Sequence, residues 1–388
     1  IPDRIDEGYG MNPEAVRSIA RDGASLLITV DCGITAFLEV QLAQSLGMDV
    51  IVTDHHEPHG EIPSAVAVIN PKRHDELYPF RDLAGVGVAY KLAQALLMAV
   101  KGTPEASTPA DCLLDLVALG TIADVSPLVG ENRVFAKQGL AKINRTENLG
   151  LQSLIQVCSL TDRIITAGTV GFVLAPRLNA AGRIGDASLC AELLLTDSPE
   201  RAMAIAEFLD NVNSERQEME MKIFKEASSM VETCGGQPID SVLVLANEGW
   251  HPGVIGIVAS RLVEEFNRPT ILISLDGDEG RGSGRSIPEF DLYKALSLCS
   301  DTLLRFGGHK YAAGIAVSRH AIDGFREEIN EVGRSVLSED DFLPKVFCHQ
   351  ELALDEIDLE VAKGIAMLAP FGVANPTPVF LSTEVMLK

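Results

Sequence analysis

Residues 53–58 (Thr-Asp-His-His-Glu-Pro) place a carboxylate and two imidazoles side by side. They follow the run 50–52 (Val-Ile-Val), which is typical of a buried strand. Ligands of an open parallel sheet bind beyond the carboxyl ends of its strands, and imidazole with carboxylate suits a divalent cation. The motif therefore indicates a metal site at a strand end. The alternative is a surface loop with two solvated histidines.

The segments before this motif predict a βαβ unit that positions it. Residues 26–30 are an apolar run that ends in Asp31, residues 35–46 have apolar positions at helical spacing, and Gly47 stands where a helix C-cap is expected. The two strands of such a unit are parallel and joined by a right-handed crossover. Asp31 and the 53–58 motif are therefore expected at the same edge of one sheet.

A third acidic group ends a predicted buried helix. Residues 116–124 are apolar nearly all round up to Asp124, and a buried carboxylate without a partner is costly. A helix cap or an ion pair would also satisfy Asp124. Three such groups that converge on one point favour a metal site.

These three motifs are similar, in order, to those of the DHH phosphoesterases. Five more segments resemble the RecJ branch of that family, the bacterial single-strand-specific 5′→3′ DNA exonucleases: residues 83–89, 177–183, 250–256, 282–286 and 306–309. The resemblance extends from Pro2 to about Phe380. It implies an α/β fold in which a parallel-sheet DHH domain is joined by a long helix to a smaller α/β DHH-associated domain, with the active cleft between them.

The pattern of the chain agrees with this organisation. Residues 199–234 read as one helix whose polar middle is typical of a helix that bridges domains. The predicted parts are a DHH domain, connecting helices, a DHH-associated substrate-binding domain, and a linker with the beginning of an OB-fold: residues 1–187, 188–235, 236–338 and 339–388. Short strands are expected at 346–348 and after the turn-rich segment 371–380.

The resemblance implies metal-assisted phosphodiester hydrolysis with one or two Mn²⁺ or Mg²⁺ ions. Mn²⁺ is favoured, because imidazole beside carboxylates suits it better. Asp31, His55 and Asp124 are the expected ligands, and His56 binds the second ion or donates to the transition state. Asp54 is expected to orient a histidine. Asp54 and His56 are thus the candidate catalytic residues.

One motif of the family is missing from the sequence. The family begins with a strand that ends in Asp-x-Asp, and no apolar strand precedes Asp3 or Asp6. We therefore expect residues 1–388 to hold only part of the metal site and to be nearly inactive alone. We also expect Lys388 to fall before an OB barrel could close.

Two glycine-containing motifs supply candidate phosphate contacts. The hydroxyl of Ser283 and the guanidinium of Arg285 suit a phosphate group, although an ordinary hairpin turn is the alternative. Gly307 and Gly308 allow close backbone approach, and His309 can contact a phosphate. The alternative here is a capped turn with a core histidine. The resemblance favours a bound DNA strand in both cases.

A further candidate site for the end of the strand is the segment that begins at Asn179. The small residues 180–182 allow close substrate approach, and Arg183 is predicted to contact a terminal 5′-phosphate. Arg177 is the competing candidate, and either arginine could instead form a structural ion pair.

Composition fits a cytoplasmic enzyme more readily than a DNA-coating protein. The 388 residues are 46% hydrophobic, no run is long and apolar enough to span a bilayer, no signal peptide is visible, and the 7 scattered cysteines are expected to be reduced. The net charge of −23 argues against a broad basic surface, so attraction to DNA must be local.

The resemblance implies single-stranded DNA as the partner, with a single-strand-binding protein or a helicase as protein partners, no membrane, and a monomer. The first alternative function is a DHH phosphodiesterase of short oligoribonucleotides or cyclic dinucleotides, against which the segment 345–388 argues. The second is a catalytically inactive DHH scaffold, against which the intact motifs argue.

Overall fold

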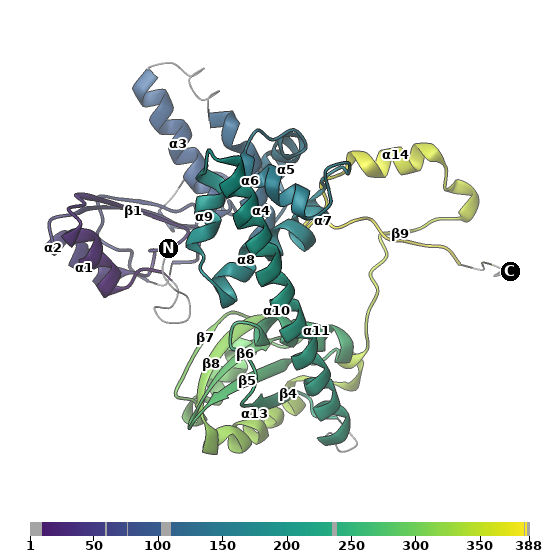
Figure 1. Cartoon of the computed structure of the whole chain (residues 1–388). Helices are drawn as coiled ribbons and strands as arrows, with labels where there is room; N and C mark the ends of the chain where they lie inside the picture. Colours follow the sequence, from purple (N-terminus) through teal and green to yellow (C-terminus); the bar gives the residue numbers. More distant parts are fainter. Residues whose placement is uncertain are drawn as a thin grey trace. The chain divides into compact units, whose positions relative to one another are not determined.

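The computed structural model describes residues 10–58, 60–75, 77–101, 110–234, 239–383 and 385. The chain forms two compact units, Ile1–Val212 with Cys348–Lys388, and Asn213–Phe347. The division falls within helix α10 (Pro199–Cys234), which is labelled in Figure 1. The long helix expected over 199–234 is therefore confirmed. The domain boundaries expected after residues 187, 235 and 338 stay a prediction.

The first unit contains a parallel sheet with the strand order β1 (Leu26–Val30), β2 (Asp49–Thr53), β3 (Ala67–Ile69). The crossover from β1 to β2 is helix α2 (Phe37–Ser45). Side chains of α2 and of helix α1 (Pro13–Arg21) pack on the face of β2 that carries Val50 and Val52. The predicted βαβ unit is confirmed, and its register sets Val30 opposite Thr53, so the segments after both strands leave one edge.

Helices make up most of the rest of this unit. In chain order they are α3 (Gly85–Lys101), α4 (Leu114–Ala123), α5 (Gly130–Ile143), α6 (Leu149–Val157), α7 (Ala167–Thr169), a π-helical turn (Val170–Leu174), α8 (Ala175–Ile184) and α9 (Ser188–Leu195). Most of α4 is buried, as its composition predicts. Gly139 on α5 allows a close approach, because a Cβ there would lie 2.1 Å from the Leu114 carbonyl oxygen. This packing holds the first half of α4 against α5, and Asp124 is the C-cap residue at the other end of α4.

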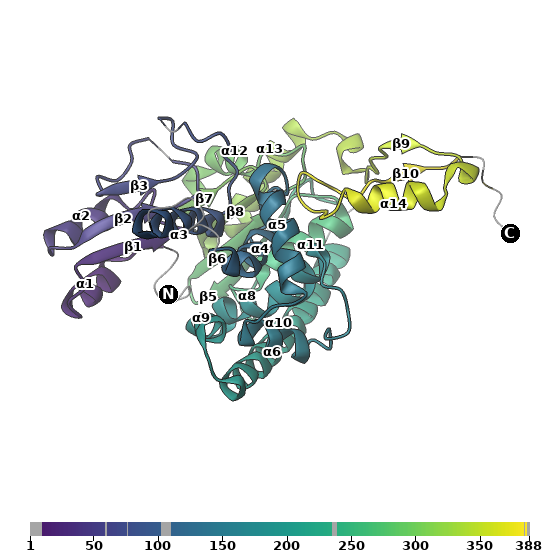
Figure 2. The same cartoon turned by 90° about the horizontal axis from the view of Figure 1, so that it is seen from above.

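The second unit is built on a five-stranded sheet with the order β4-β5-β6-β8-β7. Its strands are β4 (Leu243–Asn247), β5 (Thr270–Asp276), β6 (Glu279–Arg285), β7 (Arg305–Gly308) and β8 (Ala312–Ser318). Only β4 and β5 are parallel. Helices α12 (Leu292–Leu298) and α13 (Ile322–Val336), both labelled in Figure 2, share the apolar core on one face. Helix α11 (Ile255–Phe266) packs against β5 and β6.

The last segment returns to the first unit. The Leu128 amide donates to the Val373 carbonyl at 2.7 Å, helix α14 spans Leu359–Met367, and β9 (Gln350–Glu351) pairs in parallel with β10 (Phe380–Leu381). The strand predicted at 346–348 is wrong, since these residues have no pairing partner and Val346 and Phe347 are exposed. β-Branched and aromatic residues favour a strand only where a neighbour pairs with it.

Within the described chain, none of the helices has the length and apolar composition needed to cross a membrane.

Candidate functional site

The tips of β1 and β2 are fixed by short polar contacts. The Thr29 hydroxyl donates to the Cys32 carbonyl at 2.7 Å, and the Thr53 hydroxyl donates to the Thr29 carbonyl at 2.6 Å. Asp31 has φ of +62° and Gly33 has φ of +111°, so the chain turns sharply after β1. A Cβ at Gly33 would approach the Thr29 hydroxyl to 2.9 Å, so the turn requires glycine there.

Asp54 is buried, with 1% of its surface exposed, and both of its oxygens accept hydrogen bonds. Oδ2 accepts from the Ile34 amide at 2.9 Å, and Oδ1 accepts from the His55 amide at 2.7 Å and from His56 Nδ1 at 2.7 Å. Burial by itself would raise the pKa of Asp54, but hydrogen bonds from His56 and from the Ile34 amide outweigh it and lower the pKa. Asp54 is thus a charged residue that holds the backbone and one histidine.

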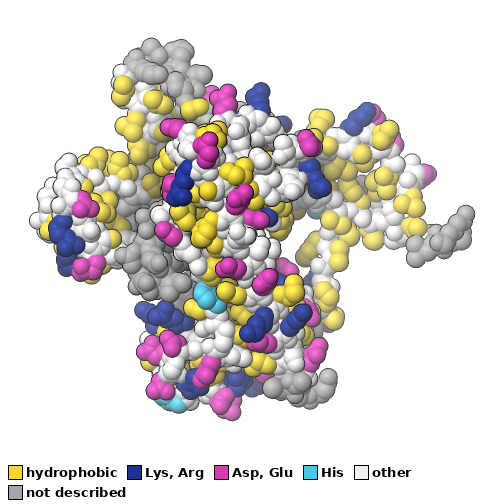
Figure 3. All heavy atoms as spheres, in the orientation of Figure 1, with side chains coloured by type: hydrophobic (Ala, Val, Ile, Leu, Met, Phe, Trp, Pro, Cys, Tyr) yellow, Lys and Arg dark blue, Asp and Glu magenta, His cyan; other side chains and the backbone are white. Residues whose placement is uncertain are grey.

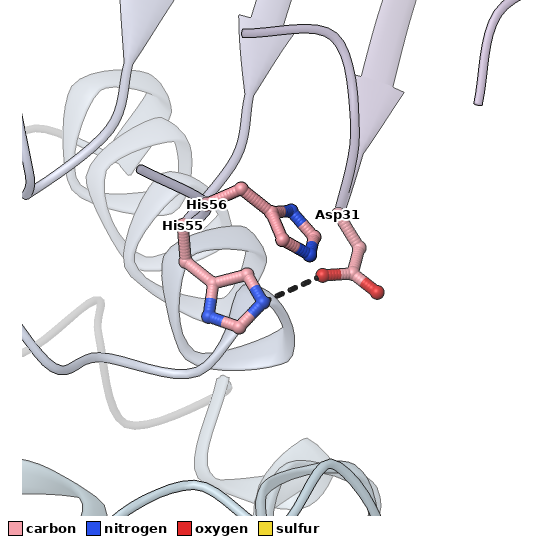
Figure 4. Close-up of side chains that lie close together, drawn as sticks. All are labelled: Asp31, His55 and His56. Atoms are coloured by element: carbon pink, nitrogen blue, oxygen red, sulfur yellow. Dashed lines mark ion pairs between the residues drawn. The ribbon is translucent and has the colours of Figure 1, made fainter. Parts of the chain in front are cut away.

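His56 presents its second nitrogen to the strand edge. Its Nδ1 is held by Asp54, and this hydrogen bond raises the pKa of His56. The His55 and His56 rings meet edge to face, with centroids 4.6 Å apart. Figure 4 shows Asp31, His55 and His56 grouped where β1 and β2 end, and one donor atom of each lies within 4.8 Å of the others.

His55 connects the strand edge to helix α4. Its Nε2 lies 2.9 Å from Asp31 Oδ1 and 3.8 Å from Asp124 Oδ2. This nitrogen is buried, and apart from the ion pair with Asp31 no described residue forms a hydrogen bond with it. The Ser126 hydroxyl donates to Asp124 Oδ2 at 2.7 Å and so orients that carboxylate. A buried imidazole nitrogen between two carboxylates fits a divalent cation, which would satisfy all three groups.

Gly85 belongs to the site, although sequence reasoning gave it no role there. It opens helix α3, and a Cβ at this position would lie 2.4 Å from Asp31 Oδ1. Only glycine lets the helix start approach the carboxylate this closely. A glycine at a helix start is only a weak signal in a sequence, and the contact with Asp31 joins residues 54 positions apart.

Ser283 and Arg285 lie on strand β6, so the hairpin-turn alternative is wrong. Arg285 Nη1 donates to the Ser283 hydroxyl at 3.2 Å and to the Gly284 carbonyl at 2.7 Å. Burial lowers the pKa of Arg285. Gly256, in the first turn of α11, leaves room for both side chains, since a Cβ there would lie 2.8 Å from the Ser283 hydroxyl.

The Gly307, Gly308 and His309 motif ends β7. The His309 amide donates to the Ala312 carbonyl at 2.8 Å, which closes the connection to β8. His309 is exposed, so the core-histidine alternative is wrong.

Arg177 and Arg183 both lie on α8. Arg177 Nε donates to Asp210 at 2.8 Å and its Nη1 donates to the Val173 carbonyl at 2.7 Å, so Arg177 forms a structural ion pair. Arg183 lies one helical turn after Asn179, which is exposed, so both residues share a face of α8. Contact of Arg183 with a 5′-phosphate stays a prediction.

A strand edge with a carboxylate–imidazole cluster, and a second unit with a half-buried arginine beside a hydroxyl, are features typical of metal-binding phosphoesterases. Family comparisons agree with this class. Residues 1–121 match the DHH family, N-terminal domain, residues 240–334 match the DHHA1 domain, and residues 348–388 match the RecJ OB domain.

Curated relatives named single-stranded-DNA-specific exonuclease RecJ match almost the whole chain. The protein from Bacillus subtilis is 45% identical over 100% of the chain and 48% of its own length, and that from Salmonella typhimurium is 38% identical over 98% and 68%. The RecJ structure from Thermus thermophilus in complex with Mn²⁺ is 35% identical, with a TM-score of 0.84 over 96% of this chain and 54% of that one. The same protein is also solved with Mg²⁺. The chain belongs to the RecJ family of DHH proteins and spans about half the length of the Bacillus relative.

Proposed function

We propose that this chain carries the core of a metal-dependent exonuclease that degrades single-stranded DNA from the 5′ end. The observation that carries the proposal is the convergence of Asp31, His55, His56 and Asp124 on one strand edge. Family membership supports the substrate, since the relatives are named for single-stranded DNA.

Asp31, His55 and Asp124 would hold Mn²⁺ or Mg²⁺, with His56 as a further ligand or as a donor to the transition state. When bound, the ion lowers the pKa of a water molecule and neutralises charge on the phosphoryl oxygens. Asp54 would fix the tautomer of His56 by accepting from Nδ1, which leaves Nε2 for the ion or for the transition state.

The proposed substrate contacts lie on both units. Ser283 and Arg285 would bind a phosphate of the strand, with the backbone of Gly307 and Gly308 and the side chain of His309 close to the same strand. Asn179 and Arg183 would bind the 5′ end. Charge-assisted hydrogen bonds from arginine to phosphate give the protein its hold on a polyanion despite its own negative charge.

A phosphodiesterase of short oligoribonucleotides or cyclic dinucleotides is the competing function. The match of residues 348–388 to the RecJ OB domain favours a long strand, because OB-folds commonly bind single strands. The monomeric state, the cytoplasmic location and a single-strand-binding protein or helicase as partner rest on the resemblance alone and stay predictions.

The test uses a protein that carries an upstream Asp-x-Asp segment in addition to residues 1–388. It compares DNA strands labelled at either end, with Mn²⁺ present and with EDTA. The proposal predicts Mn²⁺-dependent release of labelled mononucleotide from a 5′-labelled single strand at the earliest times. A 3′-labelled strand should shorten progressively, and duplex DNA should stay intact. First release from the 3′ end, or faster cleavage of a diribonucleotide than of the DNA strand, would contradict the proposal.

A further inference from the structure

One face of the second unit's sheet is covered by core helices, and the residues of β6 alternate between this face and the other. Cβ atoms at the glycines of β6, positions 280, 282 and 284, would lie 2.5–2.8 Å from core side chains, so these positions face the core. Successive residues of a strand point to opposite faces. Arg281, Ser283 and Arg285 therefore point to the other face.

On this other face, one row of paired residues crosses three strands and has an arginine at each end. Arg281 on β6 pairs with Ala316 on β8, and Ala316 pairs with Arg305 on β7. Directly opposite residues share a face, so Arg281 and Arg305 stand on either side of a small side chain. Both arginines are exposed.

The neighbouring row on this face has almost no side chains. Ser283 pairs with Gly314, and Gly314 pairs with Gly307. A Cβ at Gly307 would meet no described atom within 4 Å, and one at Gly314 would meet only the Gly282 carbonyl oxygen, at 3.9 Å. Neither glycine has a positive φ. Packing and backbone conformation therefore do not require glycine here, whereas close approach of a ligand to the strand does.

The charged residues in these two rows, Arg281 and Arg305, are both basic. Within the part of the chain that the structure describes, no carboxylate lies at ion-pair distance from Arg281, Arg285 or Arg305. Glu279 lies on the same face, two residues beyond Arg281, and marks its acidic end. Acidic and basic side chains are interspersed over the side of the molecule shown in Figure 3. In a chain of net charge −23, arginines kept apart from acids are suited to an external anion.

We propose that Arg281 and Arg305, with the bare row of Gly307 and Gly314, form a track for the sugar–phosphate backbone of the single strand. The track rests on the proposed function and extends it beyond Ser283 and Arg285. Alternate residues on a strand are about 6.8 Å apart, so Arg281 and Arg285 are separated by about 14 Å. This separation exceeds the reach of one phosphate group, so the track holds more than one nucleotide.

The first test measures binding of a fluorescent oligothymidylate by anisotropy, in EDTA so that no hydrolysis occurs. Arg281→Ala and Arg305→Ala should each weaken binding about tenfold, as expected for one charge-assisted contact. Each should also reduce the slope of log K against log salt by about 0.7. Arg334→Ala is the matched control, because it removes an exposed arginine from α13, on the covered face, with the same change in net charge.

A second variant tests whether the glycine at position 314 is needed for DNA binding or for folding. Gly314→Val adds a β-branched side chain that favours a strand and projects into open space, so thermal stability should be kept or raised while DNA binding falls. Wild-type binding together with unchanged affinity in Arg281→Ala, Arg305→Ala and Gly314→Val would overturn the track and leave the proposed function standing. A wild-type protein that does not bind the oligonucleotide would overturn both.

Discussion

The three aspartates of the site, Asp31, Asp54 and Asp124, have different roles. Asp54 uses both oxygens on Ile34, His55 and His56, whereas Asp31 and Asp124 face the His55 ring. The residue types alone do not distinguish a carboxylate that binds an ion from one that orients a histidine. The distinction comes from burial and from the hydrogen bonds around Asp54.

The role of Asp54 predicts the effect of Asp54→Asn. The amide keeps the shape but loses the charge that holds His56 Nδ1, so Mn²⁺ affinity measured by calorimetry should fall about 10- to 100-fold. Asp49→Asn, at the exposed start of the same strand, is the control and should leave Mn²⁺ affinity unchanged. Equal affinities in the two variants would show that Asp54 does not orient the site.

Gly85 predicts a second effect on metal binding. In Gly85→Ala the added Cβ would lie 2.4 Å from Asp31 Oδ1, so the carboxylate must move and Mn²⁺ affinity should fall about tenfold or more. The control, Gly324→Ala on α13, meets nothing within 4 Å and should only stabilise its helix, by about 0.5–1 kcal/mol. Unchanged Mn²⁺ affinity in Gly85→Ala would mean that Asp31 does not need its observed position.

At the scale of elements, local sequence patterns predicted helices and strands, but they did not predict contacts between residues far apart in the chain. The apolar runs and the C-cap glycine predicted β1, α2 and β2, because these signals lie within one βαβ unit. The strand predicted at 346–348 failed because pairing depends on a partner elsewhere in the chain. The sequence did not predict the track residues Arg281 and Arg305, because only the register of β6, β8 and β7 brings them to one face.

The packing of α4 on α5 predicts a stability effect. A Cβ in Gly139→Ala would lie 2.1 Å from the Leu114 carbonyl oxygen and 2.3 Å from Ala118 Cβ. Overpacking of this kind should lower the free energy of unfolding by about 1–3 kcal/mol in urea titrations, despite the better helix propensity of alanine. A Gly139→Ala protein as stable as wild type would show that the two helices can separate without cost.

At the scale of the whole molecule, the net charge of −23 excludes capture of DNA by a broad basic surface. Recognition of the DNA strand must then depend on a few basic side chains at specific positions. The 5′ end is the sharpest case, because one terminal phosphate distinguishes it from every internal position.

Arg183 should read that phosphate. A charge-assisted contact contributes about 1.5–3 kcal/mol, so removing the 5′-phosphate should slow cleavage by wild type about 10- to 150-fold. The loss should be much smaller for Arg183→Ala and unchanged for Arg163→Ala, an exposed arginine of the same unit. Equal losses in wild type and Arg183→Ala would exclude Arg183 as the reader of the 5′ end.

The central claim is that one strand edge binds the catalytic ion. An anomalous difference map from crystals of the protein soaked in Mn²⁺ tests it directly. The account predicts a peak at roughly 2–2.5 Å from a carboxylate oxygen of Asp31, from His55 Nε2 and from a carboxylate oxygen of Asp124. A Mn²⁺ peak held by other residues, with none between these three side chains, would contradict it.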